Sequence, residues 1–219
     1  MMNSINSSQK GFSLIELMVA MAITSVVMAG IYTFYHNQLK THITQQEMVD
    51  MQQDARAAMY MMTREIRMAG YDPQNAGEAS IRTANVAEIA FDSDDNGNGE
   101  IDTNERERFY YALNNGNGDL ERGRWDDLGN LNTVALNIDA LNFVYLDNAG
   151  DTTSDLEAIR SVQITLVARS GDEVPALMRK RTDRTTYTNQ QGTPILLAQN
   201  DNFRRIRLTA TVKVRNLGL

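Results

Sequence analysis

The chain has 219 residues, a formal net charge of −7, 42% hydrophobic residues and no cysteine. This composition excludes a disordered or collagen-like chain and leaves about one folded domain once an N-terminal segment is set aside. The lack of cysteine excludes disulfides, iron–sulfur clusters and thiol nucleophiles, and the negative charge argues against a dedicated nucleic-acid binder.

An apolar segment runs from residue 12 to residue 35 and carries one charge, Glu16. A helix needs about 20 apolar residues to cross a bilayer, so this segment is long enough to span one. A short polar leader, residues 1–11, precedes it, and no small-x-small cleavage site follows Tyr35. We therefore expect the segment to be retained as a membrane-spanning helix. A carboxylate inside hydrocarbon is costly, so Glu16 is predicted to be functional.

The residues from Lys10 to Leu17 read KGFSLIEL, and this stretch resembles the prepilin motif of type IV pilins and type II secretion pseudopilins. The resemblance implies that a prepilin peptidase cuts between Gly11 and Phe12 on the cytoplasmic side and that Phe12 is then N-methylated. It also implies that Glu16 meets the N-terminal amine of a neighbouring subunit's Phe12 in an assembled filament, since a buried charge needs a partner. The alternative is an uncleaved signal anchor, which gives no reason for Glu16.

Apolar residues recur at three- and four-residue spacing beyond Tyr35, which predicts that the helix continues as an amphipathic one. They are Leu39, Ile43, Met48, Met51, Ala55, Ala58, Met62, Ile66 and Ala69. Gly70 and Pro73 then supply a stop signal. The sequence thus predicts one helix over residues 12–70, with residues 12–35 in the membrane and the second half packed on a domain.

Residues 71–219 are predicted to form a globular, β-rich domain. Period-two alternation predicts strands near residues 109–113, 141–145, 162–168 and 206–214, and residues 86–91 also look like a strand. Turn-forming residues mark 114–119, 148–151 and 170–172, and the polar stretch 182–202 is expected to be a loop. The fold class is therefore α+β, with a long N-terminal helix packed on a C-terminal antiparallel sheet, as in pilins.

The end of the predicted helix, residues 59–73, reads MYMMTREIRMAGYDP, and the last strand ends in Val214-Arg215-Asn216. These stretches are similar to PilW-type minor pilins and more distantly to the J-type pseudopilin. The disulfide-bearing C-terminal loop of many major pilins is absent, and this favours a minor pilin or pseudopilin over a major subunit.

The most acidic part of the chain, residues 94–105, reads DDNGNGEIDTNE and fits the twelve-residue calcium loop D-x-[DN]-x-[DN]-G-x5-E. The pattern predicts Ca²⁺ ligands at Asp94, Asn96, Asn98, Glu100 (through its backbone carbonyl), Asp102 and Glu105. Flanking strands in place of helices would make this a calcium loop on a β-hairpin. The alternative is an acidic Asn/Gly turn, but the seven acids between residues 92 and 107 repel one another unless a cation lies among them.

No enzyme motif is present, and the predicted globular domain has no histidine to act as a base. The leading hypothesis is a minor type IV pilin in the inner membrane, single-pass, with its globular domain in the periplasm and later in the pilus. Its expected partners are other pilins and the prepilin peptidase. The alternatives are a minor pseudopilin of a type II secretion system, a tip adhesin, or a DNA-uptake module using residues 179–181, although nucleic-acid binding is the weakest of these.

Overall fold

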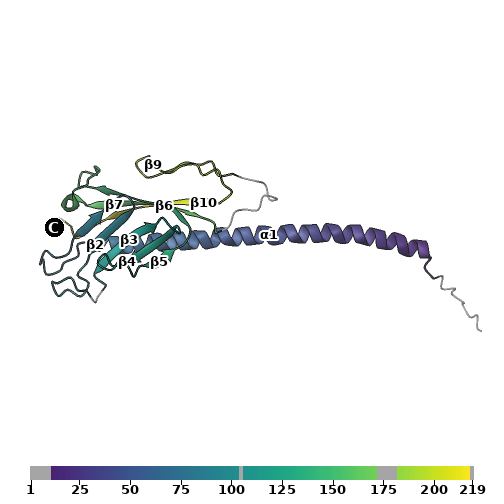
Figure 1. Ribbon diagram of the computed structural model, residues 1–219, viewed down its shortest axis with the longest axis horizontal. Coiled ribbons are helices and arrows are strands. Elements are labelled where there is room, and N and C mark those ends of the chain that lie inside the picture. Colours follow the sequence, from purple (N-terminus) through teal and green to yellow (C-terminus); the bar gives the residue numbers. More distant parts are fainter. Residues whose placement is uncertain (1–10, 104–105, 172–181, 218–219) are drawn as a thin grey trace, which may run out of the picture. The chain divides into compact units, whose positions relative to one another are not determined.

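A computed structural model of the chain describes residues 11–103, 106–171 and 182–217. It contains one long helix followed by short and medium strands (Figure 1). The elements are α1 (Leu14–Ile66), β1 (Ile81–Ala84), β2 (Glu88–Asp92), β3 (Arg108–Asn114), β4 (Asp119–Gly123), β5 (Asn132–Ala135), β6 (Ile138–Leu146), a 3₁₀ turn η1 (Leu156–Ala158), β7 (Ser161–Arg169), β8 (Tyr187–Thr188), β9 (Pro194–Leu196) and β10 (Arg205–Lys213). The chain divides into two compact units, residues 1–45 and residues 46–219, so the boundary falls within α1.

The α-helix ends at Ile66, four residues before its predicted end at residue 70. After Ile66, the backbone N–H of Met68 donates to the carbonyl of Glu65 at 2.9 Å and that of Ala69 to the carbonyl of Ile66 at 3.1 Å. These bonds reach three residues back instead of four, so the last turn tightens and leaves the α-helical ladder. Gly70 then takes a φ of +73°, the left-handed conformation that closes many helices.

The C-terminal part of α1 buries one stripe of side chains, as its spacing predicted. The buried residues are Met51, Ala55, Ala58, Met59, Met62 and Ile66, and Ala69 continues the stripe beyond the helix. Leu39 and Ile43, which were expected on the same stripe, are 42% and 56% exposed. The expectation was wrong for these two because they belong to the first unit, whereas the residues of the core come from the second.

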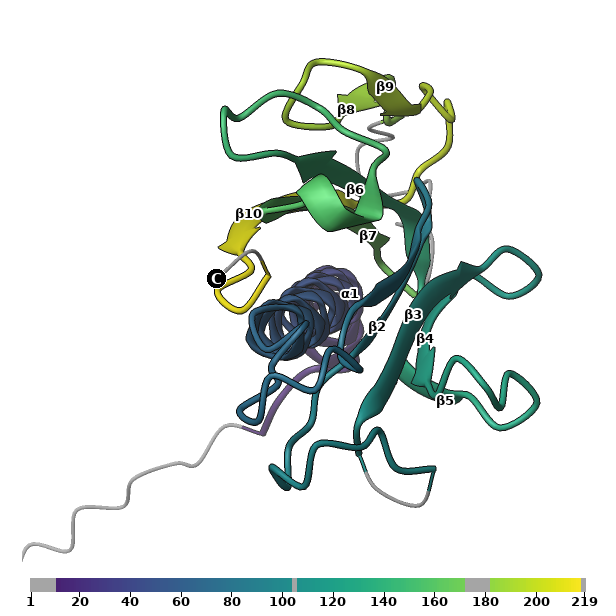
Figure 2. The same cartoon turned by 90° about the vertical axis from the view of Figure 1, so that its left-hand side faces the viewer.

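Two antiparallel sheets enclose this stripe. The five-stranded sheet has the order β1-β2-β3-β4-β5, and the three-stranded sheet has the order β10-β7-β6. Figure 2 shows the C-terminal part of α1 lying between them. Apolar side chains from both sheets, among them Phe91, Tyr111, Phe143 and Ile164, meet α1 in one core. The predicted α+β class, with the helix packed on antiparallel sheets, is confirmed.

The strongly alternating strands were predicted well, and the others were not. The strands predicted at 109–113, 141–145, 162–168 and 206–214 correspond to β3, β6, β7 and β10. Strand β2 begins only at Glu88, and the 66% exposed Val86 lies before it. Strands β1, β4 and β5 were missed.

The expectation of a plain loop over residues 182–202 was wrong, because this stretch contains the small β8–β9 hairpin. Asn189, in the turn of this hairpin, is 7% exposed, and its Nδ2 donates to Oδ1 of Asn142 on β6 at 3.1 Å. The Oδ1 of Asn189 accepts the backbone N–H groups of Gln191 and Thr193. Hydrogen bonds of the buried Asn189 therefore organise the hairpin. Its sequence lacks the apolar alternation from which strands were predicted.

One polar cluster joins α1 to the five-stranded sheet. Glu65 accepts hydrogen bonds from Nε and Nη2 of Arg122 at 2.9 and 2.8 Å, and from the hydroxyl of Tyr111 at 2.5 Å. Tyr111 lies on β3 and Arg122 on β4. Burial, together with the carboxylate of Glu65, raises the pKa of the Tyr111 hydroxyl, so the phenol stays a hydrogen-bond donor.

The C-terminal residues cover the end of the helix. A Cβ on Gly70 would lie 2.3 Å from Cδ2 of Leu217, and Val212 and Val214 are both 2% exposed. The backbone N–H of Val214 donates to the carbonyl of Arg160 at 2.9 Å. The end of α1 and the C-terminal segment are therefore packed together.

Neighbouring methionines on α1 allow a matched test of the buried stripe. Met62 is 0% exposed and Met61 is 39% exposed. We expect Met62→Ala to lower the free energy of unfolding by about 2–5 kcal/mol, because the change leaves a cavity in the core. Met61→Ala should change it by no more than about 0.5 kcal/mol. Denaturant unfolding of the full chain in a neutral detergent checks this, and equal effects of the two variants would contradict the assigned helix face.

Candidate functional site

The predicted processing site lies ahead of the helix in exposed chain. Gly11 and Phe12 precede the helix, and Phe12 is 91% exposed. A peptidase must bind its substrate as extended backbone, so this position ahead of α1 suits cleavage between the two residues. The structure does not test the cleavage itself.

Glu16 has a local role that the sequence reading missed. Its Oε2 accepts the backbone N–H of Ser13 at 2.8 Å, while the hydroxyl of Ser13 accepts the backbone N–H of Glu16 at 3.3 Å. This reciprocal pair is a capping box, and the sequence Ser13-Leu14-Ile15-Glu16 contains its S-x-x-E signature. The helix therefore begins at Leu14, and Oε1 of Glu16 has no hydrogen bond among those found in the described residues.

The first part of α1 presents apolar side chains to its surroundings. Eight of them are Leu14, Ile15, Met18, Ile23, Val26, Ile31, Tyr32 and Phe34, each more than half exposed. Within the described residues, α1 is the one helix that is long and apolar enough to cross a membrane. Three hydroxyls in this segment, on Thr24, Ser25 and Thr33, donate to carbonyls four residues back, so they do not need water.

The acidic loop connects β2 to β3, as predicted for a loop on a hairpin. The paired residues at its base are Phe91 with Phe109 and Asp92 with Arg108. Asp94 is 1% exposed, and its two carboxylate oxygens accept the backbone N–H groups of Gly97, Asn98 and Gly99. The backbone of the loop therefore curls around the carboxylate of Asp94, which its N–H groups bind.

Four of the predicted calcium ligands lie together in this loop. The amide nitrogens of Asn96 and Asn98 both donate to Oδ2 of Asp102, at 3.1 and 2.9 Å. The Oδ1 atoms of the two asparagines accept backbone N–H groups two residues ahead, one of them on Glu100. Glu105 lies outside the described residues. Within the described residues, no group of three or more His, Cys, Asp or Glu side chains is arranged to hold a metal ion, and calcium binding stays a prediction.

Glu107 organises the same loop, and the motif did not single it out. It is 0% exposed, and its carboxylate accepts the backbone N–H of Asp102 at 2.7 Å and that of Asn96 at 3.3 Å. No sequence signal pointed to Glu107, because a calcium loop places its closing glutamate two residues earlier.

The neighbouring Asp92 is buried and partnered. It pairs with Arg82 across the β1–β2 hairpin, and its Oδ1 accepts the indole N–H of Trp125 at 2.7 Å. Burial raises the pKa of Asp92, although these two partners oppose the shift. Asp92, Asp94 and Glu107 thus each have donors within the protein, so repulsion among the acids does not by itself require a cation.

The loop predicts a contrast between two acidic residues. Glu107→Ala removes two hydrogen bonds to a buried carboxylate, so we expect it to destabilise the protein by about 2 kcal/mol. Asp95→Ala, at an exposed carboxylate in the same loop, should have an effect within about 0.5 kcal/mol. Thermal unfolding, with hydrogen exchange at the amides of Asn96 and Asp102, checks both. Unchanged exchange at these amides in Glu107→Ala would contradict the role given to Glu107.

Comparisons with known proteins bear on both parts of the chain. Residues 6–32 match the family model of the prokaryotic N-terminal methylation motif. Residues 44–189 match the family model of prepilin peptidase-dependent protein B. No curated protein is similar enough to count as a match. A solved type IV-like pilin from Thermus thermophilus aligns with 76% of this chain and 97% of its own at 15% identity, with a TM-score of 0.49. The chain therefore belongs to the family of prepilin peptidase-dependent protein B, and it carries the prepilin-type methylation motif at the start of its apolar helix.

Proposed function

We propose that this protein is a minor type IV pilin, a structural subunit that helps to prime pilus assembly or to form the pilus tip. The observation that carries the proposal is the KGFSLIEL stretch at the start of an exposed apolar helix. The helix is followed in the same chain by a globular unit with its own core. Such a chain suits a subunit held through α1, first in the inner membrane and then among the helices of a filament, with the globular unit on the periplasmic side.

The same features suit a minor pseudopilin of a type II secretion system, which remains the alternative. The neighbouring genes discriminate between them, since pilus genes and secretion-channel genes form different clusters. A DNA-uptake role rests on the basic residues 179–181, which lie outside the described residues. We propose a structural role and no catalytic one.

The capping box sharpens the test of Glu16. Glutamine also completes a capping box, so Glu16→Gln keeps the helix start and removes only the charge, whereas Glu16→Ala removes both. If Glu16 pairs with a neighbouring N-terminal amine, both variants should be cleaved normally and be several-fold depleted from sheared filaments. The measurement is intact mass of the membrane-extracted protein, which should begin at methylated Phe12, followed by quantification in filaments.

One result would contradict prepilin processing, and another would contradict the pairing of Glu16 with a neighbouring amine. Native protein that still begins at Met1 or Met2 would exclude prepilin processing. Normal incorporation of Glu16→Gln with loss of Glu16→Ala would assign Glu16 to helix capping alone.

We further propose that residues 94–105 bind calcium and thereby stabilise the β2–β3 hairpin. Carboxylate and amide oxygens are ligands that Ca²⁺ prefers, and the side chains of Asp94, Asn96, Asn98 and Asp102 are already gathered by hydrogen bonds. The amides of Asn96 and Asn98 donate to Asp102 without the ion, so binding through their oxygens requires both amides to turn.

Calcium titration tests this second proposal. At a Kd of about 10⁻⁴ M, 1 mM calcium stabilises the folded state by about 1.4 kcal/mol. The full chain in detergent should therefore unfold at a higher temperature in calcium than in EGTA, and magnesium should substitute poorly. Asp94→Ala should abolish the difference, and Asp95→Ala should preserve it. If the metal-stripped protein takes up no calcium at millimolar concentration, the calcium proposal is wrong and the stretch is an acidic Asn/Gly turn.

A further inference from the structure

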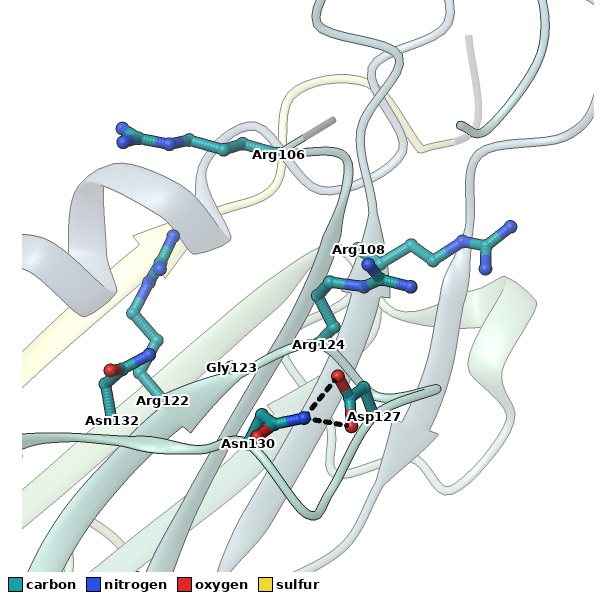
Figure 3. Close-up of a pocket in the computed structure, with 8 residues that line it drawn as sticks. All are labelled: Arg106, Arg108, Arg122, Gly123, Arg124, Asp127, Asn130 and Asn132. Atoms are coloured by element: carbon teal, nitrogen blue, oxygen red, sulfur yellow. Dashed lines mark hydrogen bonds between the residues drawn. The ribbon is translucent and has the colours of Figure 1, made fainter. Parts of the chain in front are cut away.

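A second polar site lies on the five-stranded sheet, next to the acidic loop. It is a pocket of about 190 Å³ between the residues that precede β3, the end of β4 and the start of β5 (Figure 3). Four of its lining side chains are arginines, Arg106, Arg108, Arg122 and Arg124. Because β5 is an edge strand of the sheet, the pocket is accessible from outside the molecule.

Three of these arginines are already paired with carboxylates. Arg122 binds Glu65, as described above. Arg108 and Arg124 both bind Asp126, at 2.5 and 2.6 Å. The hydrogen bonds from Arg124 and Arg108 lower the pKa of Asp126 to about 2, so this carboxylate is ionised at neutral pH. These pairs hold the guanidinium groups in place and leave further N–H donors on each of them.

Arg106 is the exception. Its side chain is exposed, and it forms no ion pair with any residue in the described part of the chain. Figure 3 shows Arg106 and Arg122 extending to the same side of the pocket, while Arg108 turns to the other. Asp127 is the one carboxylate among the lining residues. Both of its oxygens accept hydrogen bonds from Nδ2 of Asn130, at 3.0 and 2.9 Å.

The charges of the pocket select the kind of anion that fits it. The lining residues and their ion-pair partners carry four guanidinium groups and three carboxylates, Glu65, Asp126 and Asp127, which leaves one net positive charge among them. A carboxylate carries one negative charge and neutralises this excess. A doubly charged phosphate would leave negative charge beside Asp127, and a nucleic acid would add more of it. A volume of about 190 Å³ admits the end of an acidic side chain.

We propose that this pocket receives the carboxylate of an acidic side chain from a neighbouring pilin-like subunit, with Arg106 as the principal donor. The guanidinium group of Arg106 offers the forked donor pair that matches a carboxylate, and the exposed Asn132 at the start of β5 also lines the pocket. The inference rests on the proposed function only for the identity of the partner. Its site lies in the second unit, whereas the assembly test concerns Glu16 in the first, so either can fail alone.

The test is a calorimetric titration of the full chain in a neutral detergent with tetraglutamate, and in parallel with inorganic phosphate. We expect saturable binding of tetraglutamate that weakens as salt is added. Arg106→Gln should reduce the affinity about tenfold or more, because it removes a charge-assisted hydrogen-bond pair. Arg106→Lys should restore part of it. The control is Arg56→Gln, at an exposed arginine on α1 that is remote from the pocket in sequence, and it should bind as the unaltered protein does.

Three results would overturn the inference. One is the absence of saturable binding. Another is an equal loss of affinity in Arg106→Gln and Arg56→Gln, which would mean non-specific attraction. The third is tighter binding of phosphate than of tetraglutamate with the same dependence on Arg106, which would assign the pocket to phosphate esters. Because Arg106 is exposed and makes no described ion pair, its variants are expected to fold, and a circular-dichroism melt verifies this.

Discussion

The attachment of the long helix to the five-stranded sheet depends on one carboxylate, Glu65. Three hydrogen bonds reach it from Arg122 and Tyr111. The apolar stripe of α1 determines which face is buried, but methionine and alanine contacts are non-directional and tolerate sliding along the helix. A bidentate arginine and a tyrosine on two adjacent strands do not tolerate it. Glu65 therefore fixes the register of the helix against the sheet.

The same arrangement connects the core with the arginine pocket. Arg122 binds Glu65 with Nε and Nη2 and lines the pocket on its other side. A group that enters the pocket therefore meets a guanidinium whose position is set by α1. The acidic loop follows a similar rule, since Asp94 and Glu107 are held by backbone N–H groups and not by solvent. In both places a buried polar group is satisfied by partners within the protein.

The extent to which the sequence predicted this structure differs between local and distant contacts. The helix and the strands β3, β6, β7 and β10 follow from the period of their apolar residues. Strand β4 could not be found in this way, because Leu120 is the one buried residue in its Asp119–Gly123 span. The contact between Glu65 and Arg122 joins residues 57 positions apart, and that between Asp92 and Trp125 spans 33 positions. A single sequence carries no periodicity that links such pairs. The capping box at Ser13, unlike these distant contacts, does have a sequence signature, S-x-x-E. It was not predicted because Glu16 was interpreted only as a partner for another subunit.

The packing of Leu217 against Gly70 has a consequence for the order of events during synthesis. A ribosome completes α1 and the five-stranded sheet well before it reaches the last strand. Val212, Val214 and Leu217 lie within the final eight residues, yet they cover the core and the end of the helix. Until they emerge, the stripe of α1 has only one complete sheet against it. The globular unit therefore closes only once residues 205–217 have been made, since β10 completes the three-stranded sheet and Leu217 covers the end of the helix.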